Sequence, residues 1–542
     1  GSVIVPFVLF IFAVVVCVVY EFRGIPMMAP DILTVQTATS VMGNYTFKLT
    51  FEQYSVILVC MAFFFTFLRL HEVKVTEKRV FHIAGFIVVA LGCGLFTNQI
   101  ILSDFMEEHQ INIRMFRPME SYQKYGGVLT FARSVGYAVV KKPEGYTTAK
   151  VDQIIQEYEK KSANEQQSTA KQYPNIITVV NETFADIKVL GDFKTNEDYM
   201  PYFHSLKKNC VTGYTYASIV GGQTANTEFE LLTGNTLGFL SAGTTAFQLY
   251  IHGQMPSLVS NLKAEGYSGN KAMHPFNPYN YNRPAVYKDF GFTDFIDKFD
   301  FPKNVKRVRE YISDEANVDR IISEYEKNRK KTDQPFYMYN MTIQNHSPYD
   351  KDAANFKQPI KIESSKYDAE ANRYLNLIKY SDDSLKQLTS YFEKCKEPTI
   401  ILFLGDHQPR LTDEFMNKIT NGQYQTWSSE QMMKRYQVPF VIWANYDIKE
   451  QHIEKTSMNY IQSILTKTAG VKMTGYQRFL NEVQKEVPTI TSQGYWGKNG
   501  KFYQINDKGS PYYGIIQKYR MIQYNMMFDK KNRRDSFFEV SK

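Results

Sequence analysis

The stretch TIILFLGDHQPRL, residues 399–411, decides the fold class. Six apolar or β-branched residues, 399–404, lead into Gly405, and Asp406 and His407 follow side by side. A continuous apolar run of this length, bounded by glycine and proline, is typical of a strand covered on both faces, as in a parallel sheet. Open α/β sheets bind ligands just beyond the carboxyl ends of such strands. The alternative is an ordinary turn that carries a surface histidine.

Elsewhere in the chain, other segments show the same pattern. Three more strand-like runs are NIITVV (175–180), PFYMYNMTI (335–343) and PFVIWA (439–444), and helical segments 314–330 and 367–394 lie between them. Alternation of this kind predicts an α/β domain with a mainly parallel central sheet. We place this domain at residues 172–542.

The first hundred residues differ sharply from the rest. Runs 3–20, 54–70 and 81–102 are nearly free of charge, and each is about as long as a membrane-spanning helix. We expect residues 1–102 to form three transmembrane helices, with three buried core helices as the alternative. Four basic residues crowd the connection between the second and third runs: Arg69, Lys74, Lys78 and Arg79. Because positive loops stay inside, we predict a multi-pass cell-membrane protein whose residues after Leu102 are extracellular.

Residues 103–171 are polar, with an amphipathic piece at 128–140 and a charged helical stretch at 148–161. We predict a membrane-proximal linker with amphipathic helices. The chain has 542 residues and a formal net charge of +8, which suits work near anionic lipid or an anionic polymer. Basic residues do not cluster as nucleic-acid binding requires, so no nucleic-acid partner is expected. Cys210 and Cys395 have no metal-ligand or redox spacing, which argues against a disulfide scaffold.

Polar side chains follow three of the predicted strands. Run 175–180 leads into Asn181 and Glu182, run 335–343 is followed by His346, and Asp406 and His407 end the opening stretch. In a parallel sheet these ends share one edge. Glutamate, aspartate and histidine suit a divalent cation, and imidazole shifts the preference from Mg²⁺ toward Mn²⁺ or Zn²⁺.

A candidate nucleophile lies in GGQTANTEFELLTG, residues 221–234. Two glycines permit close approach, and Thr224 precedes a predicted helix whose amide end favours anions. A threonine hydroxyl is a poor nucleophile until a metal stabilises its alkoxide. The alternative is that Thr224 only caps the helix, with Thr227 and Glu230 forming a capping box.

Five motifs in this order carry a resemblance to a known family: PNIITVVNETF, GGQTANTEFELLTG, HPFNPYNYNR, NHSPY and GDHQP. Together they resemble the lipoteichoic acid synthase-like phosphoglycerol transferases of the alkaline phosphatase and sulfatase superfamily. The resemblance covers the apolar N-terminal region and nearly all of the chain from residue 174 onward. It implies a sulfatase-like α/β catalytic domain.

The resemblance also implies a set of site residues. One Mn²⁺, with Mg²⁺ as the alternative, would be bound by Glu182, Thr224, Asp406 and His407, and Thr224 would be the nucleophile. The phosphoglycerol group would be held by His274, Arg283 and His346, and His346 would also protonate the leaving group. Better-known lipoteichoic acid synthases have a tryptophan where this chain has Tyr281, which keeps an aromatic wall and adds a hydroxyl. A planar guanidinium such as that of Arg283 can pair phosphate oxygens bidentately.

The function implied is extracellular transfer of glycerol phosphate from phosphatidylglycerol to a teichoic acid, as in lipoteichoic acid synthesis, through a phosphothreonine-type intermediate. Decoration of a wall polysaccharide with glycerol phosphate is a second possible acceptor reaction. A formylglycine sulfatase is improbable because its Cys-x-Pro-x-Arg signature is missing around Cys210 and Cys395. Two rival interpretations stay open: a phosphoethanolamine transferase and a non-catalytic membrane protein that binds glycopolymer.

Overall fold

The computed structural model describes residues 4–23, 26–29, 51–70, 79–103, 105–109, 111, 118–138, 140–161, 172–241, 244–422 and 426–540. The chain forms two compact units. The first consists of Gly1–Lys141 with Ser241–Thr244, and the second of Lys142–Leu240 with Thr245–Lys542.

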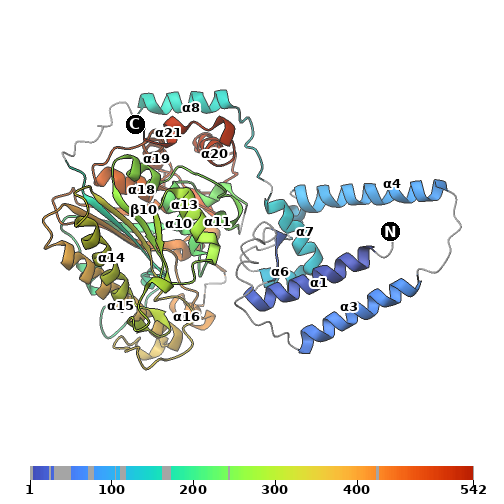
Figure 1. Cartoon of the computed structure of the whole chain (residues 1–542), viewed down its shortest axis with the longest axis horizontal. Coiled ribbons are helices and arrows are strands. Elements are labelled where there is room, and N and C mark those ends of the chain that lie inside the picture. The colour runs from blue at the N-terminus through green and yellow to red at the C-terminus, as the bar shows by residue number, and fades with distance from the viewer. Residues whose placement is uncertain are drawn as a thin grey trace. The chain divides into compact units, whose positions relative to one another are not determined.

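The first unit is helical in its described part (Figure 1). Its helices are α1 (Ile4–Arg23), α3 (Phe51–Leu70), α4 (Arg79–Phe96), η2 (Thr97–Leu102), α5 (Phe105–Glu108), α6 (Pro118–Tyr125) and α7 (Gly127–Ala138). Among the residues described, none of the helices combines the length and the apolar character that crossing a membrane requires. The structure therefore does not confirm the spans predicted at 3–20, 54–70 and 81–102. Lys74 and Lys78, on which the predicted orientation depends, lie outside the described residues.

The second unit contains an eight-stranded sheet in the order β10-β2-β9-β8-β1-β7-β3-β4. These strands are β1 (Asn175–Asn181), β2 (Cys210–Tyr216), β3 (Ser268–Met273), β4 (Asp294–Ile296), β7 (Phe336–Met341), β8 (Thr399–Gly405), β9 (Gln437–Ala444) and β10 (Gln451–Ser457). All pair in parallel except β9, which is antiparallel to both β8 and β2. The predicted mainly parallel α/β domain is confirmed, and the four predicted strands are β1, β7, β8 and β9.

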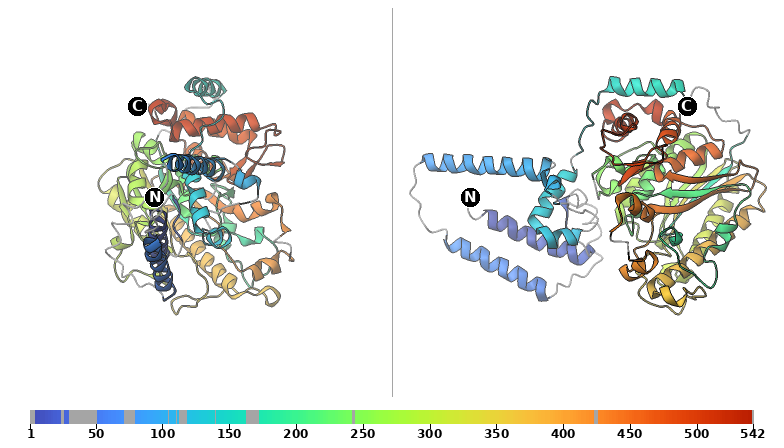
Figure 2. Two further views of the ribbon diagram at one scale, coloured as in Figure 1. Left: turned by 90° about the vertical axis from the view of Figure 1, so that its right-hand side faces the viewer. Right: turned by 180° about the vertical axis from the view of Figure 1, so that it is seen from behind.

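Helices cover both faces of this sheet (Figures 1 and 2). Helices α14 (Asp314–Arg329) and α15 (Ala369–Phe392) pack together and contact β3, β7 and β8. Other contacts are made by α12 (Leu258–Ala264) with β3 and by α18 (Met458–Thr468) with β2 and β10. Strands β1, β7 and β8 are consequently buried along their whole length. This two-sided burial is the reason their sequences are continuous apolar runs.

The register of the central strands brings their carboxyl ends to one edge. Asn181 at the end of β1 pairs with Gly405 at the end of β8, and Val180 pairs with Met341 at the end of β7. At Gly405 the chain passes so close to its neighbour that an added Cβ would lie 1.8 Å from the carbonyl oxygen of Phe184. No side chain fits there, so glycine is required where the strand delivers its polar residues.

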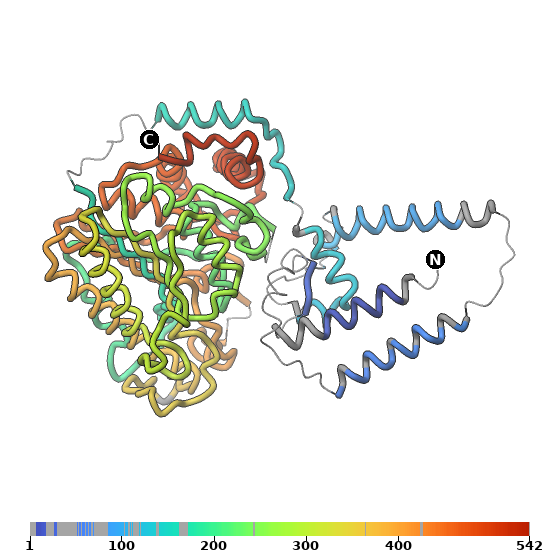
Figure 3. Tube along the Cα trace, in the orientation of Figure 1, coloured from blue at the N-terminus to red at the C-terminus, as the bar shows by residue number. Residues whose placement is uncertain are grey.

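Helix α8 (Thr148–Lys161), predicted to belong to a membrane-proximal linker, instead packs within the second unit. It contacts α19 (Gly475–Glu486) and α20 (Tyr513–Met527), beside which Figure 3 shows it. Its buried face consists of Val151, Ile154 and Tyr158. Two ion pairs add to this contact, Glu157 with Lys518 at 2.7 Å and Asp152 with Arg534 at 2.6 Å. The predicted charged helix at 148–161 therefore also has an apolar face, and that face is covered by protein.

Replacing Ile154 with alanine should therefore destabilise the second unit. Ile154 is 1% exposed, and truncation of a buried isoleucine typically costs about 2–5 kcal/mol. We expect the midpoint of urea unfolding to move to a lower urea concentration in Ile154→Ala. The neighbouring Ile155 is half-buried, so Ile155→Ala should lower the free energy of unfolding clearly less. Equal midpoints for Ile154→Ala and the unmodified chain would contradict this packing.

Candidate metal centre and its surroundings

Three buried side chains meet at the carboxyl edge of the sheet. Glu182 follows β1, and Asp406 and His407 follow β8. One potential ligand atom from each lies within 4.8 Å of the other two. The aligned ends of two neighbouring strands thus assemble the cluster that the sequence predicted. His346 is not part of it.

Hydrogen bonds orient the two β8 ligands. Asp406 Oδ1 accepts from the backbone N–H groups of Thr183 (2.6 Å) and His407 (2.7 Å). His407 Nδ1 lies 2.9 Å from the carbonyl oxygen of Gln408, to which it can only donate, and this leaves Nε2 as the nitrogen with a lone pair. Asp406 Oδ2 and His407 Nε2 are buried, lie 3.2 Å apart and have no hydrogen-bond partner among the described residues. Two unsatisfied acceptors this close together fit a bound cation.

The electrostatics of the cluster lead to the same conclusion. Burial, and then the neighbouring Asp406 carboxylate, raise the pKa of Glu182 to about 8. Two carboxylates crowded in a dry site repel each other, and a divalent cation between them removes that cost. Two carboxylates and one imidazole form a ligand set that suits a divalent metal.

Thr224 is brought to this cluster by an unusual turn. Gly221, Gly222 and Gln223 all have positive φ, at 68°, 143° and 66°, and α10 (Thr224–Thr233) begins directly after them. Thr224 is 6% exposed, and its Oγ1 lies 3.4 Å from Glu182 Oε2. The first residue of the helix therefore presents its hydroxyl to the cluster, at the end of the helix that favours negative charge.

The alternative capping-box interpretation is wrong. The N-cap residue is Gln223, and Thr227 lies inside the helix. Thr227 Oγ1 donates to the carbonyl oxygen of Asp406 at 2.8 Å. Glu230 accepts hydrogen bonds from Ser218 and from the backbone of Leu237. Thr227 instead attaches the helix to the backbone of a cluster residue.

The residues assigned to phosphoglycerol binding surround the cluster. His274 follows β3, is buried, and hydrogen-bonds through Nδ1 to the carbonyl oxygen of Met341 at 3.0 Å. Burial, and then the charge of Arg283, lower the pKa of His274 well below its usual value. The Tyr281 ring centroid lies 5.2 Å from the Arg283 guanidinium carbon. His346 is half-buried, and burial lowers its pKa also.

These groups interact with one another and with the cluster. Arg283 and His346 both lower the pKa of His274, while Asp406 opposes the lowering at His346. Glu182 in turn lies close enough to Arg283 for the guanidinium to favour its charged form. Arg283 and His346 thus interact electrostatically with the candidate metal ligands, and His274 and Tyr281 interact with Arg283.

Arg283 is held by an acidic residue that the sequence motifs did not single out. Glu228 Oε1 accepts from Arg283 Nε at 3.0 Å and Nη2 at 2.7 Å. Its other oxygen, Oε2, accepts from Tyr287 at 2.5 Å and Tyr339 at 3.1 Å. Arg283 and Glu228 are both buried, so this is a desolvated ion pair. One edge of the guanidinium is therefore committed to Glu228, and only the remaining N–H groups can reach a ligand.

Glu228 and Arg309 both support site residues, but the sequence points only to the first. Glu228 lies four residues after Thr224, on the same side of one helix, so helical spacing could have found it. Arg309 donates to the carbonyl oxygens of Gln344 (2.9 Å) and His346 (2.7 Å) and so fixes the loop that carries His346. No local sequence signal connects Arg309 to a loop 37 residues away.

Residues 174–471, more than half of the chain, match the family model described as Sulfatase. The chain belongs to the sulfatase family. Within that family it is similar to lipoteichoic acid synthases, as the motifs predicted.

Two curated relatives illustrate this membership. The chain is 30% identical over 433 residues to a putative cyclic beta-1,2-glucan modification protein of Rhizobium meliloti (strain 1021), covering 78% of this chain and 65% of that protein. It is 23% identical over 374 residues to the lipoteichoic acid synthase of Staphylococcus saprophyticus, covering 66% of this chain and 55% of that protein. The chain thus spans less than two thirds of the length of either relative.

A solved structure shares the fold. The phosphoglycerol transferase GacH of Streptococcus pyogenes, solved in complex with sn-glycerol-1-phosphate, superposes with a TM-score of 0.60 at 20% identity. The match covers 74% of this chain and 100% of that chain. At this identity the likeness establishes the fold.

Replacing Asp406 with asparagine should abolish metal binding by this sulfatase-family protein. The amide keeps the Oδ1 acceptor for Thr183 and His407 but loses the negative charge that a divalent cation needs. We expect elemental analysis to find little bound Mn²⁺ in Asp406→Asn, and added Mn²⁺ to raise the melting temperature only of the unmodified protein. Asp382→Asn, at a buried carboxylate that accepts from the backbone of Tyr202 and Phe203, should retain the metal. Full occupancy in Asp406→Asn would place the metal elsewhere.

Arg283→Lys should weaken binding of a phosphate-containing substrate. Lysine keeps one charge but cannot serve Glu228 and a ligand oxygen with one planar fork, so we expect a loss of about 1–3 kcal/mol in binding. The dependence of turnover on substrate concentration measures this loss of binding. A thermal melt of the variant is recorded in parallel, because the buried Glu228 loses part of its hydrogen bonding and the fold can be destabilised. The matched variant is Arg320→Lys, at an arginine paired with Glu324 at 3.1 Å outside the site. An unchanged concentration response in Arg283→Lys would remove Arg283 from the binding site.

Proposed function

We propose that the protein is a metal-dependent phosphoglycerol transferase that moves glycerol phosphate from phosphatidylglycerol to a cell-envelope glycopolymer. The observation that carries this proposal is the position of Thr224, buried at the start of α10 with its hydroxyl 3.4 Å from the Glu182 carboxylate. A nucleophile beside a cation site, faced by an arginine and two histidines, suits transfer of a phosphate group. The activities named for the lipoteichoic acid synthase and for GacH support the same reaction.

Two displacements at phosphorus account for the transfer. In the first, the Thr224 oxygen loses its proton and bonds to phosphorus, and the bond from phosphorus to the diacylglycerol oxygen breaks. That oxygen takes up a proton, and diacylglycerol leaves as an alcohol. In the second, an acceptor hydroxyl loses its proton and bonds to phosphorus, and Thr224 is released with its proton restored. A divalent cation, for which we propose Mn²⁺ because of the imidazole ligand, would stabilise negative oxygen at this site.

The surrounding residues divide the remaining tasks. We assign Arg283 to the phosphate oxygens and Tyr281 to the wall beside it, since its ring lies against the guanidinium. Neutral His274, whose Nδ1 is engaged by Met341, presents Nε2 to the substrate. The lowered pKa of His346 favours a neutral ring near pH 7. His346 is therefore better suited to take the acceptor's proton than to protonate the leaving diacylglycerol, the role that the family resemblance implied.

The acceptor and the location belong to the same proposal. A growing polyglycerolphosphate chain and a saccharide are both terminated by hydroxyls that can attack phosphorus. The name of the Rhizobium meliloti relative supports a glycan acceptor. A lipid donor also favours attachment at the membrane, with the catalytic unit outside, as the apolar N-terminal runs and their basic loop predict.

Covalent catalysis at Thr224 is the test of this function. The unmodified protein, loaded with Mn²⁺ and incubated with fluorescent phosphatidylglycerol but no acceptor, should release fluorescent diacylglycerol and gain a glycerophosphoryl mass on the peptide containing Thr224. Thr224→Ala should lose both signals and remain folded. Thr233→Ala, which removes a hydroxyl bonded to the Phe229 carbonyl at the far end of α10, should keep them.

Different outcomes would redirect the assignment. Release of diacylglycerol by Thr224→Ala, or an adduct on Thr227, would overturn the covalent mechanism. A phosphoethanolamine adduct from phosphatidylethanolamine, with none from phosphatidylglycerol, would identify a phosphoethanolamine transferase. Metal binding without turnover of either lipid would favour a non-catalytic glycopolymer-binding protein.

A further inference from the structure

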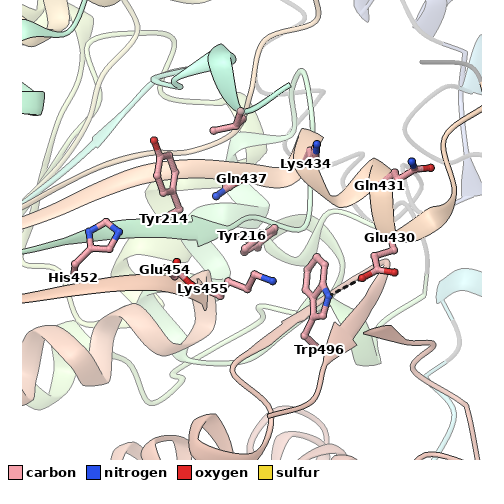
Figure 4. A pocket seen from close by; sticks show the side chains of 11 residues that line it. Tyr214, Tyr216, Glu430, Gln431, Lys434, Gln437, His452, Glu454, Lys455 and Trp496 are labelled. Atoms are coloured by element: carbon pink, nitrogen blue, oxygen red, sulfur yellow. Dashed lines mark hydrogen bonds between the residues drawn. The ribbon is translucent and has the colours of Figure 1, made fainter. Parts of the chain in front are cut away.

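A cavity outside the candidate metal centre lies at the β10 end of the eight-stranded sheet. It has a volume of about 630 Å³, within the range of small-molecule sites. Three neighbouring strands form its floor: Tyr214 and Tyr216 come from β2, Gln437 from β9, and Glu454 from β10. Figure 4 shows these side chains around the cavity, which the metal ligands do not line.

Aromatic rings dominate one side of this cavity. Tyr214 and Tyr216 are two residues apart on one strand and therefore share a face. Trp496, from β12 (Gly494–Trp496), lies with its ring centroid 5.1 Å from that of Tyr216, and its Nε1 donates to Glu430 Oε1 at 3.4 Å. Trp496 and Tyr216 are each 5% exposed and belong to one buried cluster, so only the edges of these two rings border the cavity, and Tyr214 is the more accessible ring.

Polar groups of balanced charge surround the rings. Lys434 and Lys455 oppose Glu430 and Glu454, so these four side chains have no net formal charge. All four are exposed, and the Lys455 ammonium lies 5.1 Å from the Trp496 ring centroid. Donors and acceptors are thus available beside flat rings without a field that favours anions. A neutral sugar matches this lining, because its C–H groups can contact the accessible parts of the aromatic rings and its hydroxyls can both donate and accept hydrogen bonds.

The cavity wall is tied directly to the metal centre. Gln408, the residue after His407, donates from Nε2 to the carbonyl oxygens of Lys434 (2.7 Å) and Gln437 (2.8 Å). Because β9 runs antiparallel, it begins at the edge where β8 ends. Two strand spacings, roughly 10 Å, separate β8 from β2. A chain of a few sugars can span this distance.

We propose that this cavity binds neutral sugar residues of the acceptor glycan. Binding there places the terminal hydroxyl of the glycan near Thr224. This inference rests on the proposed function and narrows its acceptor from a glycopolymer in general to a neutral saccharide. The hydroxyl loses its proton and bonds to phosphorus as the bond from phosphorus to Thr224 breaks. The sugars in the cavity increase the affinity for the glycan and orient it, and they do not react themselves.

Binding is measured first, without donor, on the full chain loaded with Mn²⁺. Isothermal titration calorimetry with maltotetraose and with a β-1,2-linked glucotetraose should show saturable binding of at least one. Trp496→Leu removes the flat ring and should weaken that binding at least tenfold, whereas Trp496→Phe keeps a ring and should lose less. Because Trp496 is only 5% exposed, a second variant avoids the core: Glu454→Ala with Lys455→Ala should weaken binding severalfold.

The control removes one acid and one base from the loop just before β10, outside the cavity: Asp447→Ala with Lys449→Ala should bind as the unmodified chain does. In transfer assays the cavity variants should raise the KM for the saccharide and leave donor cleavage without acceptor unchanged.

Three results would overturn the site. The first is no saturable saccharide binding, and the second is binding only of a glycerol phosphate tetramer. The third is a saccharide affinity that is the same in the unmodified chain, in Trp496→Leu and in the double variant. Saccharide binding that depends on Trp496, together with no adduct on Thr224, would support the site and contradict the proposed function.

Discussion

The alignment of β1 with β8 is the constraint on which the candidate site depends. Asn181 pairs with Gly405, so the next residue of each chain segment, Glu182 and Asp406, emerges at the same level of the sheet. This pairing is possible only because Gly405 lacks a side chain where the Phe184 carbonyl approaches. A shift of one residue in either strand would turn a ligand to the opposite face of the sheet. The cluster is therefore a product of backbone register, and the buried apolar strands hold that register in place.

Much of this arrangement follows from the sequence, and the remainder depends on contacts between distant residues. The apolar runs of β1, β7 and β8 reveal both the parallel sheet and the edge that carries Glu182, Asp406 and His407. Strand β3, with the sequence SGNKAM, has no such run and forms because it pairs with β7. The sequence of β9 likewise gives no sign that this strand runs antiparallel to β8 and β2. The sequence indicates that α8 is a helix. It does not indicate which helices α8 packs against, because α19 and α20 come more than three hundred residues later.

Charge is arranged in two tiers around Thr224. Nearest to it are the carboxylates of Glu182 and Asp406, whose mutual repulsion a cation would relieve. Behind these, Glu228 compensates Arg283 in a buried pair whose other oxygen is satisfied by two tyrosines. Because of desolvation, a buried pair of this kind contributes little net stability, but it fixes a guanidinium in one orientation. If Arg283 binds phosphate as we propose, its side chain has already lost its conformational freedom before the ligand arrives.

The reversed direction of β9 has a consequence for how such an enzyme can diversify. In a fully parallel sheet, each strand presents only the loop that follows it at the catalytic edge. An antiparallel strand presents the loop that precedes it, so the segment around Lys434 joins that edge from the opposite chain direction. Side chains of this preceding loop can change while the backbone carbonyls of Lys434 and Gln437, which hold Gln408 beside the candidate metal ligand His407, stay in place. The fold thereby separates the strand ends that carry the candidate metal ligands from a neighbouring loop whose side chains can change during evolution to bind new partners.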